Sequence, residues 1–157
     1  MSDVAAGPIV FAYDGSELAE LAIAQAGRQL VAGQDAVVVC VWQPADVGFT
    51  PVGGEKTFDA ADAEEVRKAA ADVARHGAAL AEQAGFRAVG VELTAAPTWK
   101  GVVKVAKERD ASLIVIGSHR RRGVSRHLLG SVAQAVVSHS ASSVLVVHQR
   151  DEHAASD

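Results

Sequence analysis

A run of glycines and arginines near the C-terminal end of the chain contains the residue types that bind phosphate. It starts at Gly117, ends at Gly130 and Ser131, and carries four arginines in between: Arg120, Arg121, Arg122 and Arg126. A segment of helical period follows Ser131, so the free backbone N–H groups at the start of that helix would suit an anion, and the serine hydroxyl adds a donor. The run therefore indicates a phosphate site. The plainer interpretation of the arginine cluster is a solvated surface loop.

A second candidate is Asp14, which stands in the sequence Asp14-Gly15-Ser16 directly after the first apolar run. An isolated sequence of this kind is most often a turn and a helix cap. The alternative of a phosphoryl-accepting nucleophile requires an acidic partner, but Ser16 stands two positions on and no acidic residue follows the third expected strand directly. Because this turn directly follows the first apolar run, Asp14 stays a candidate functional residue beside the plainer interpretation as a cap. We predict no catalytic residue and no enzyme activity.

The composition excludes several classes of protein. The chain has 157 residues, of which 49% are apolar types and 22% are charged, values typical of one globular domain. The net charge of −4 argues against a general nucleic-acid binder. The lone cysteine, Cys40, excludes an internal disulfide and a cysteine-based zinc site, and the six histidines show no metal-ligand spacing.

No apolar run approaches the roughly 20 residues of a membrane helix, and the N-terminus lacks a secretory pattern, so we expect a cytoplasmic protein without membrane contact.

The candidate residues lie between short apolar runs that alternate with segments of helical period. Strands are expected at residues 9–13, 36–42, 89–93, 111–116 and 143–147. Helices are expected at about residues 18–30, 62–84 and 99–106, and from residue 131 with an apolar face of Val132, Ala135, Val136 and His139. This alternation predicts a parallel sheet with helices on both faces. Ligands bind such sheets beyond the carboxyl ends of the strands, where the strand order reverses.

One long connection separates the second expected strand from the second expected helix. Residues 43–58 contain two prolines and three glycines, which predicts an exposed loop. Trp42 ends the strand beside this loop. Its indole could pack on a bound base or cover the edge of the sheet, and the sequence leaves both interpretations open.

Over roughly residues 8–148 the sequence resembles the universal stress protein family. Residues 11–16, Phe-Ala-Tyr-Asp-Gly-Ser, are similar to the opening strand and turn of that family, and residues 114–119, 128–132 and 143–147 are similar to its C-terminal half. The resemblance implies one α/β domain, an open twisted five-stranded parallel sheet of order 3-2-1-4-5, of the adenine nucleotide alpha hydrolase-like type. Residues 1–7 and 149–157 would be flexible ends. It also implies a homodimer formed through the last strand, which contains Val144 and Val147.

The ATP-binding members of this family carry a glycine, two residues, a second glycine, nine residues, and then Gly-Ser or Gly-Thr. Gly117 and Gly130-Ser131 fit the outer positions at the required separation, and Arg120 stands where the middle glycine is expected. If that position needs a positive φ, a non-glycine residue costs roughly 1–2 kcal/mol. A guanidinium directed at the phosphates would offset that cost. We therefore expect nucleotide binding to survive with a changed affinity.

The resemblance also implies roles for individual residues. Asp14 would contact the adenosine part of the ligand, and the backbone of Val41 would contact the base. The ribose and phosphates would be lined by Gly117, Gly130, Ser131 and Val132. The implied cofactor is ATP, with Mg²⁺, in a stress-response sensor or regulator that acts through an unidentified protein partner. Slow ATP hydrolysis or autophosphorylation stays open. The alternative is a nucleotide-free dimeric interaction module that uses its arginine loop as the contact surface.

Overall fold

In the computed structural model, helices and strands alternate along residues 6–43, 60–118 and 129–149, which are the residues that the structure describes. In chain order the elements are β1 (Ile9–Ala12), α1 (Glu17–Gln29), β2 (Asp35–Trp42), α2 (Ala60–Gln83), β3 (Arg87–Thr94), α3 (Thr98–Glu108), β4 (Leu113–Ser118), α4 (Ser131–His139) and β5 (Ser143–His148). The strands form one parallel sheet in the order β3-β2-β1-β4-β5. The predicted fold class and strand order are confirmed.

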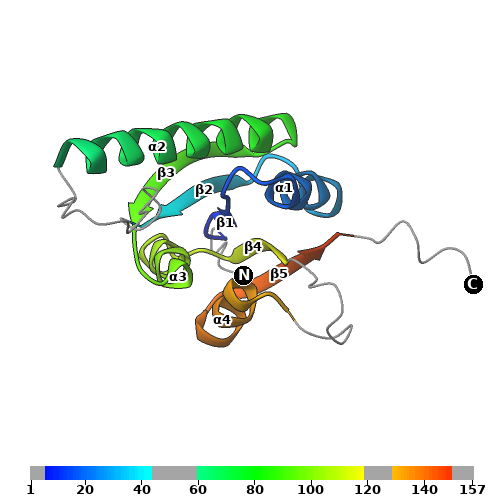
Figure 1. Ribbon diagram of the computed structural model, residues 1–157. Coiled ribbons are helices and arrows are strands. Elements are labelled where there is room, and N and C mark those ends of the chain that lie inside the picture. Colours follow the sequence, from blue (N-terminus) through cyan, green and yellow to red (C-terminus); the bar gives the residue numbers. More distant parts are fainter. Residues whose placement is uncertain (1–5, 44–59, 119–128, 150–157) are drawn as a thin grey trace, which may run out of the picture.

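The sheet lies between two layers of helices, with α1 and α2 on one face and α3 and α4 on the other (Figure 1). Successive side chains of a strand point to opposite faces, and each face carries its own apolar core. Phe11 and Val38 belong to the core beneath α1 and α2, and Val10 and Val37 to the core beneath α3 and α4. Strands that are buried on both faces must be apolar at nearly every position, which explains the continuous apolar runs in the sequence.

Strand β1 lies in the middle of the sheet, between β2 and β4. The chain moves from β1 to β2 on one side and later crosses over to β4 on the other side. Helix α1, which follows β1, and helix α4, which comes after β4, pack on opposite faces of the sheet. A reversal of this kind leaves a crevice at the carboxyl ends of the strands. The fold thus brings the turn that contains Asp14 and the end of β4 at Gly117 to the same edge of the sheet.

Strand β4 runs from Leu113 to Ser118, two residues later than the 111–116 expected from the apolar run. Its pairing with β5 continues through Gly117, opposite Val147, and Ser118, opposite His148. Ala111 is buried in the turn that precedes the strand. The expected bounds were wrong because backbone pairing, and not hydrophobicity, determines where the strand ends. As a result, Gly117 and Ser118 belong to the rigid sheet.

Helix α4 presents a different face to the sheet from the one expected. Val132 is 37% exposed, while Ala133 and Val136 are buried. His139 is exposed and stacks on Trp99 of α3, with ring centroids 4.2 Å apart. Because this short helix is apolar at most of its positions, more than one stripe fits its sequence. Packing against α3 and the sheet selects the stripe that contains Ala133 and Val136.

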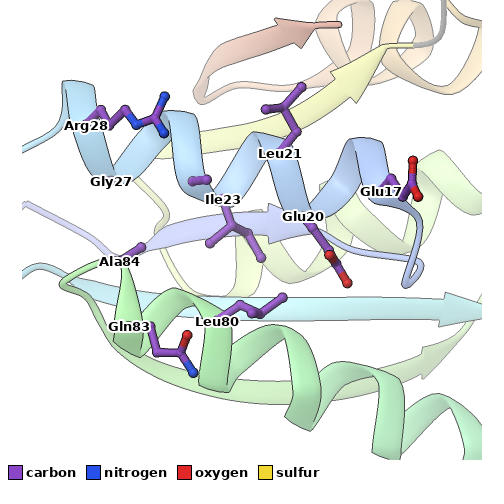
Figure 2. A pocket seen from close by; sticks show the side chains of 10 residues that line it. Glu17, Glu20, Leu21, Ile23, Gly27, Arg28, Leu80, Gln83 and Ala84 are labelled. Carbon is purple, nitrogen blue, oxygen red and sulfur yellow. The ribbon is translucent and has the colours of Figure 1, made fainter.

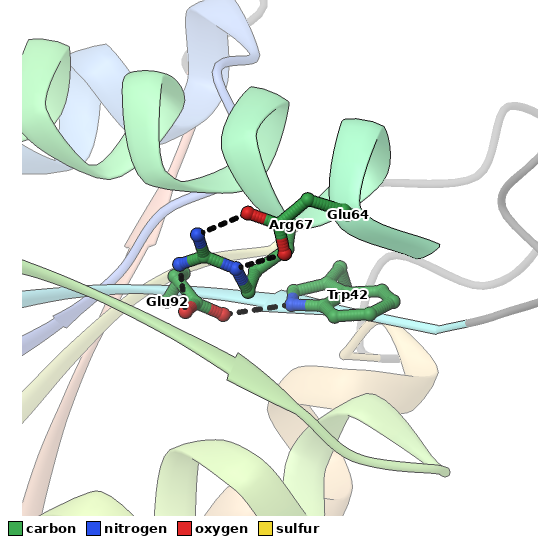
Figure 3. A network of polar contacts seen from close by, with 4 residues as sticks. All are labelled: Trp42, Glu64, Arg67 and Glu92. Carbon is green, nitrogen blue, oxygen red and sulfur yellow. Dashed lines mark hydrogen bonds and ion pairs between the residues drawn. The ribbon is translucent and has the colours of Figure 1, made fainter. Parts of the chain in front are cut away.

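Trp42 lies at the end of β2 on the α2 side of the sheet, in a polar network shown in Figure 3. Its indole Nε1 donates to Oε2 of Glu92 at 2.8 Å, and Nη1 of Arg67 lies 3.3 Å from Oε1 of the same carboxylate. Arg67 also makes two hydrogen bonds with Glu64. The network ties α2 to β2 and β3. Trp42 therefore covers the sheet beneath α2. It does not line the cavity described below, so its indole is not placed to stack on a base bound there.

Several of the expectations fall on residues outside the described ranges. They concern most of the loop at 43–58, the four arginines between Arg120 and Arg126, and the two chain ends, at residues 1–5 and 150–157. These expectations stay predictions.

Candidate functional site

A cavity of about 330 Å³, called the strand-end cavity below, lies at the carboxyl ends of β1, β2 and β4. Its volume is at the lower end of the range of small-molecule sites. It is lined by residues of three strands and of the helices that flank them: Ala12, Tyr13, Asp14, Ser16, Leu18, Ala19, Val39, Val41, Thr98, Val102, Ile116, Gly117 and Val132. Four of the six predicted site residues, Asp14, Val41, Gly117 and Val132, are in this lining. The other two, Gly130 and Ser131, directly precede Val132 at the start of α4.

Asp14 is held at the mouth of the cavity by the turn between β1 and α1. Its Oδ1 accepts a hydrogen bond from the backbone N–H of Ser16 at 2.9 Å, and the hydroxyl of Ser16 accepts one from the N–H of Ala19 at 3.2 Å. Gly15 between them has φ +81°, a conformation that favours glycine. The start of α1 is thus capped by the chain's own side chains. Among the described residues the other carboxylate oxygen of Asp14 has no hydrogen-bond donor, so it can accept a bond from a ligand hydroxyl or amine.

The start of α4 has the opposite character. Its N-cap residue is Gly130, which has no side chain to cap the helix, and the first turn contains no acidic residue. The leading N–H groups of a helix lack partners within the helix, and the helix dipole adds positive potential there. Val132, in this first turn, borders the cavity. Within the described part of the chain, an anion is therefore better matched to α4 than to the capped, acidic start of α1.

The sequence gave no indication of a role for Ser118, the last residue of β4, which forms a hydrogen bond with the N-cap residue of α4. Its side chain is 2% exposed, and its Oγ accepts a hydrogen bond from the backbone N–H of Gly130 at 2.8 Å. The only signal in the sequence was a hydroxyl residue directly after Gly117, at the end of an apolar strand. The two partners are twelve positions apart, so their contact emerges only from the fold.

Gly117 is required by packing, independently of any ligand. A Cβ atom at this position would lie 2.7 Å from Cγ of Leu18 and 3.2 Å from its carbonyl oxygen. Leu18 is buried in the first turn of α1 and also lines the cavity. The glycine therefore allows α1 to approach β4 closely, and this approach forms one wall of the cavity.

The opposite wall joins the end of β2 to the start of α3. The side-chain amide of Gln43 donates to Oγ1 of Thr98 at 3.0 Å. A Cβ atom on Gly101 would lie 2.7 Å from Cγ2 of Val41, so α3 packs directly against this valine. These contacts hold the backbone of Val41, the predicted contact for a base, in a fixed place beside Thr98.

Tyr13 borders the cavity but is not suited to act as a base. Burial, together with the nearby carboxylate of Glu20, raises the pKa of the Tyr13 phenol to about 12. The phenol is therefore protonated at neutral pH. No group of three or more histidine, cysteine or acidic side chains that could hold a metal ion occurs among the residues placed by the structure.

A larger hollow of about 600 Å³ lies between α1 and α2 and is called the α1–α2 groove (Figure 2). Ile23, Leu80 and Ala84 supply apolar surface there, and Glu17 and Glu20 supply negative charge. Arg28 is the one cation in this lining. The two carboxylates would repel a phosphate, so the groove matches the predicted anionic ligand less well than the strand-end cavity does.

Among the described residues, no helix is long and apolar enough to cross a membrane.

Comparison with known proteins gives a consistent result. The model of the universal stress protein family matches residues 6–148. Universal stress protein MJ0577 of Methanocaldococcus jannaschii is 31% identical over 70 residues, which are 45% of this chain and 43% of that protein. The matching stretch thus spans less than half of that relative.

Solved structures resemble the whole domain. The structure of MJ0577 has a TM-score of 0.71 at 22% identity and covers 94% of this chain and 99% of its own. A universal stress protein of Archaeoglobus fulgidus, solved in complex with dAMP, has a TM-score of 0.60 at 25% identity, with coverage of 89% and 96%. A universal stress protein in complex with cAMP has a TM-score of 0.63 at 23% identity, with coverage of 92% and 98%.

Proposed function

Because the chain belongs to the universal stress protein family, we propose that it binds an adenine nucleotide, ATP, in the strand-end cavity. The base lies against Val41 and the adenosine part meets the carboxylate of Asp14. The phosphates lie beside Gly117 and at the start of α4, which Gly130 and Ser131 form.

The observation that carries this proposal is the pairing of a cavity at the reversal of strand order with the uncapped start of α4. The cavity offers apolar surface from Val39 and Val41 for a base, and the helix start offers N–H groups for phosphate. The dAMP complex of the Archaeoglobus fulgidus protein supports an adenine nucleotide as the ligand class. ATP in particular rests on the match of Gly117, Gly130 and Ser131 to the spacing in the ATP-binding members of the family, and Mg²⁺ is the ion proposed to accompany its phosphates.

The protein acts in this proposal as a stress-response sensor or regulator that works by binding and not by catalysis. Two copies pair through β5, which is an edge strand and pairs only with β4 in this sheet. Its outer row of backbone N–H and C=O groups suits pairing with another strand. In the cytoplasm, a regulatory protein partner then binds the nucleotide-bound dimer.

Calorimetric titration tests the ligand assignment. We expect the purified protein, freed of bound ligand, to release or absorb heat on addition of ATP with Mg²⁺, and to bind GTP more weakly. Mass spectrometry of ligand released by heat denaturation should find an adenine nucleotide. A folded protein that gives no heat with ATP and releases no nucleotide would contradict the proposal and favour a nucleotide-free interaction module. The appearance of ADP during the titration would contradict the non-catalytic part alone.

A further inference from the structure

We propose that Ser118 is a positioning residue that holds the start of α4 in place for the phosphates. This inference rests on the proposed function, because it concerns the same cavity. The hydrogen bond from the N–H of Gly130 to Oγ of Ser118, 2.8 Å long, is the contact on which it depends.

Ser118 is a rigid anchor for this contact. It is the last residue of β4, and its backbone is in register with His148 of β5. Its side chain is 2% exposed, so its hydroxyl is shielded from solvent. Burying a hydroxyl without a hydrogen bond costs folding free energy. Here the hydroxyl accepts a hydrogen bond from the N–H of the N-cap residue of α4.

The contact fixes one end of α4 relative to the floor of the cavity. Gly117, which precedes Ser118, lines the cavity, and Val132, which follows Gly130 by two residues, lines it from the other side. Gly130 has no side chain to cap the helix, and this bond instead ties the backbone of the N-cap residue to the end of β4. It uses the N–H of Gly130 and leaves those of Ser131 and Val132 for an anion. Such pre-organisation raises affinity because fewer groups must be ordered when the ligand binds.

If Ser118 has this role, it contributes to binding of the phosphates and not to binding of the base or ribose. Replacing Ser118 by alanine removes the acceptor with little change in volume. We expect the affinity for ATP to fall about five- to tenfold, the scale of one hydrogen bond, and the affinity for adenosine to stay unchanged. Ser118→Thr keeps the hydroxyl and should restore most of the ATP affinity.

Ser142 offers a matched control. Its hydroxyl also bonds to backbone, donating to the carbonyl oxygen of Ala111 at 2.8 Å, in the turn that precedes β5. Ser142→Ala removes a comparable bond away from the cavity and should leave the ratio of ATP to adenosine affinity unchanged. Calorimetry on the full chain measures the ratio for the wild type and all three variants, each first shown to be folded by circular dichroism.

The outcomes separate the two proposals. If the wild type binds neither ATP nor adenosine, the proposed function fails and this inference fails with it. If the wild type binds both and Ser118→Ala weakens them equally, or weakens neither, the function stands and the positioning role is overturned. A selective loss for ATP that Ser118→Thr restores, and that Ser142→Ala does not reproduce, supports the inference.

Discussion

Replacing Val132 by tryptophan should lower the affinity for ATP at least tenfold without unfolding the protein. Val132 lines the strand-end cavity, yet it is 37% exposed. A larger side chain there avoids the strain that overpacking creates in a closed core, but it takes up part of a cavity of about 330 Å³. A tenfold loss corresponds to about 1.4 kcal/mol, which partial blockage of the ligand space readily exceeds. Calorimetric titration with ATP measures the effect.

Val137 provides the matched control on the same helix. It is 45% exposed and is not part of the cavity lining. Val137→Trp adds the same bulk to α4 and should leave the affinity for ATP within twofold of the wild type. Equal affinities for the two tryptophan variants would mean that the ligand does not occupy the space beside Val132.

Replacing Gly117 by alanine should destabilise the fold by about 1–3 kcal/mol even when no nucleotide is present, the usual cost of overpacking a close contact. The added methyl group would meet Cγ of Leu18 at 2.7 Å and its backbone oxygen at 3.2 Å, so α1 would have to move away from β4. Urea unfolding of wild type and variant, followed by circular dichroism without ligand, measures the difference in the free energy of unfolding.

A double-mutant cycle with Leu18→Ala tests the cause of that loss. Shortening Leu18 removes the side chain that the new methyl group meets, so the cost of Gly117→Ala should be smaller in the Leu18→Ala background. Coupling between two residues in contact is expected in the range of about 0.5–3 kcal/mol. If Gly117→Ala costs nothing in the wild type, or costs the same in both backgrounds, the glycine is not there for the packing of α1.

The helices and strands could be predicted from sequence because their determinants are local. Apolar runs such as residues 36–41 indicated strands buried on both faces, and Gly-bounded segments of helical period indicated the helices between them. The order of the strands came from the resemblance to a family, since periodicity alone does not say which strands are neighbours. The sequence could not place the end of β4 at Ser118, because pairing with β5 determines it.

Part of the candidate site could also be predicted from the sequence. Asp14 follows the first expected strand, and parallel strands bring their carboxyl ends to one edge of the sheet. The contact of Val41 with a base came from the resemblance to the family. The contact between Ser118 and Gly130 and the packing of Leu18 on Gly117 depend on tertiary distances that no spacing reveals. The exposure of Val132 was missed because α4 is apolar on several sides. Arg120, whose effect on affinity was the main expectation from the motif, lies outside the described residues.

The most direct test of the central claim is a map of backbone amide shifts, measured by nuclear magnetic resonance during titration with ATP. An adenine nucleotide in the strand-end cavity should shift the amide signals of Val41, Gly117 and residues 130–132, and leave those of Ile23 and Leu80 in the α1–α2 groove in place. Shifts confined to the groove, or no shift at saturating ATP, would contradict the account.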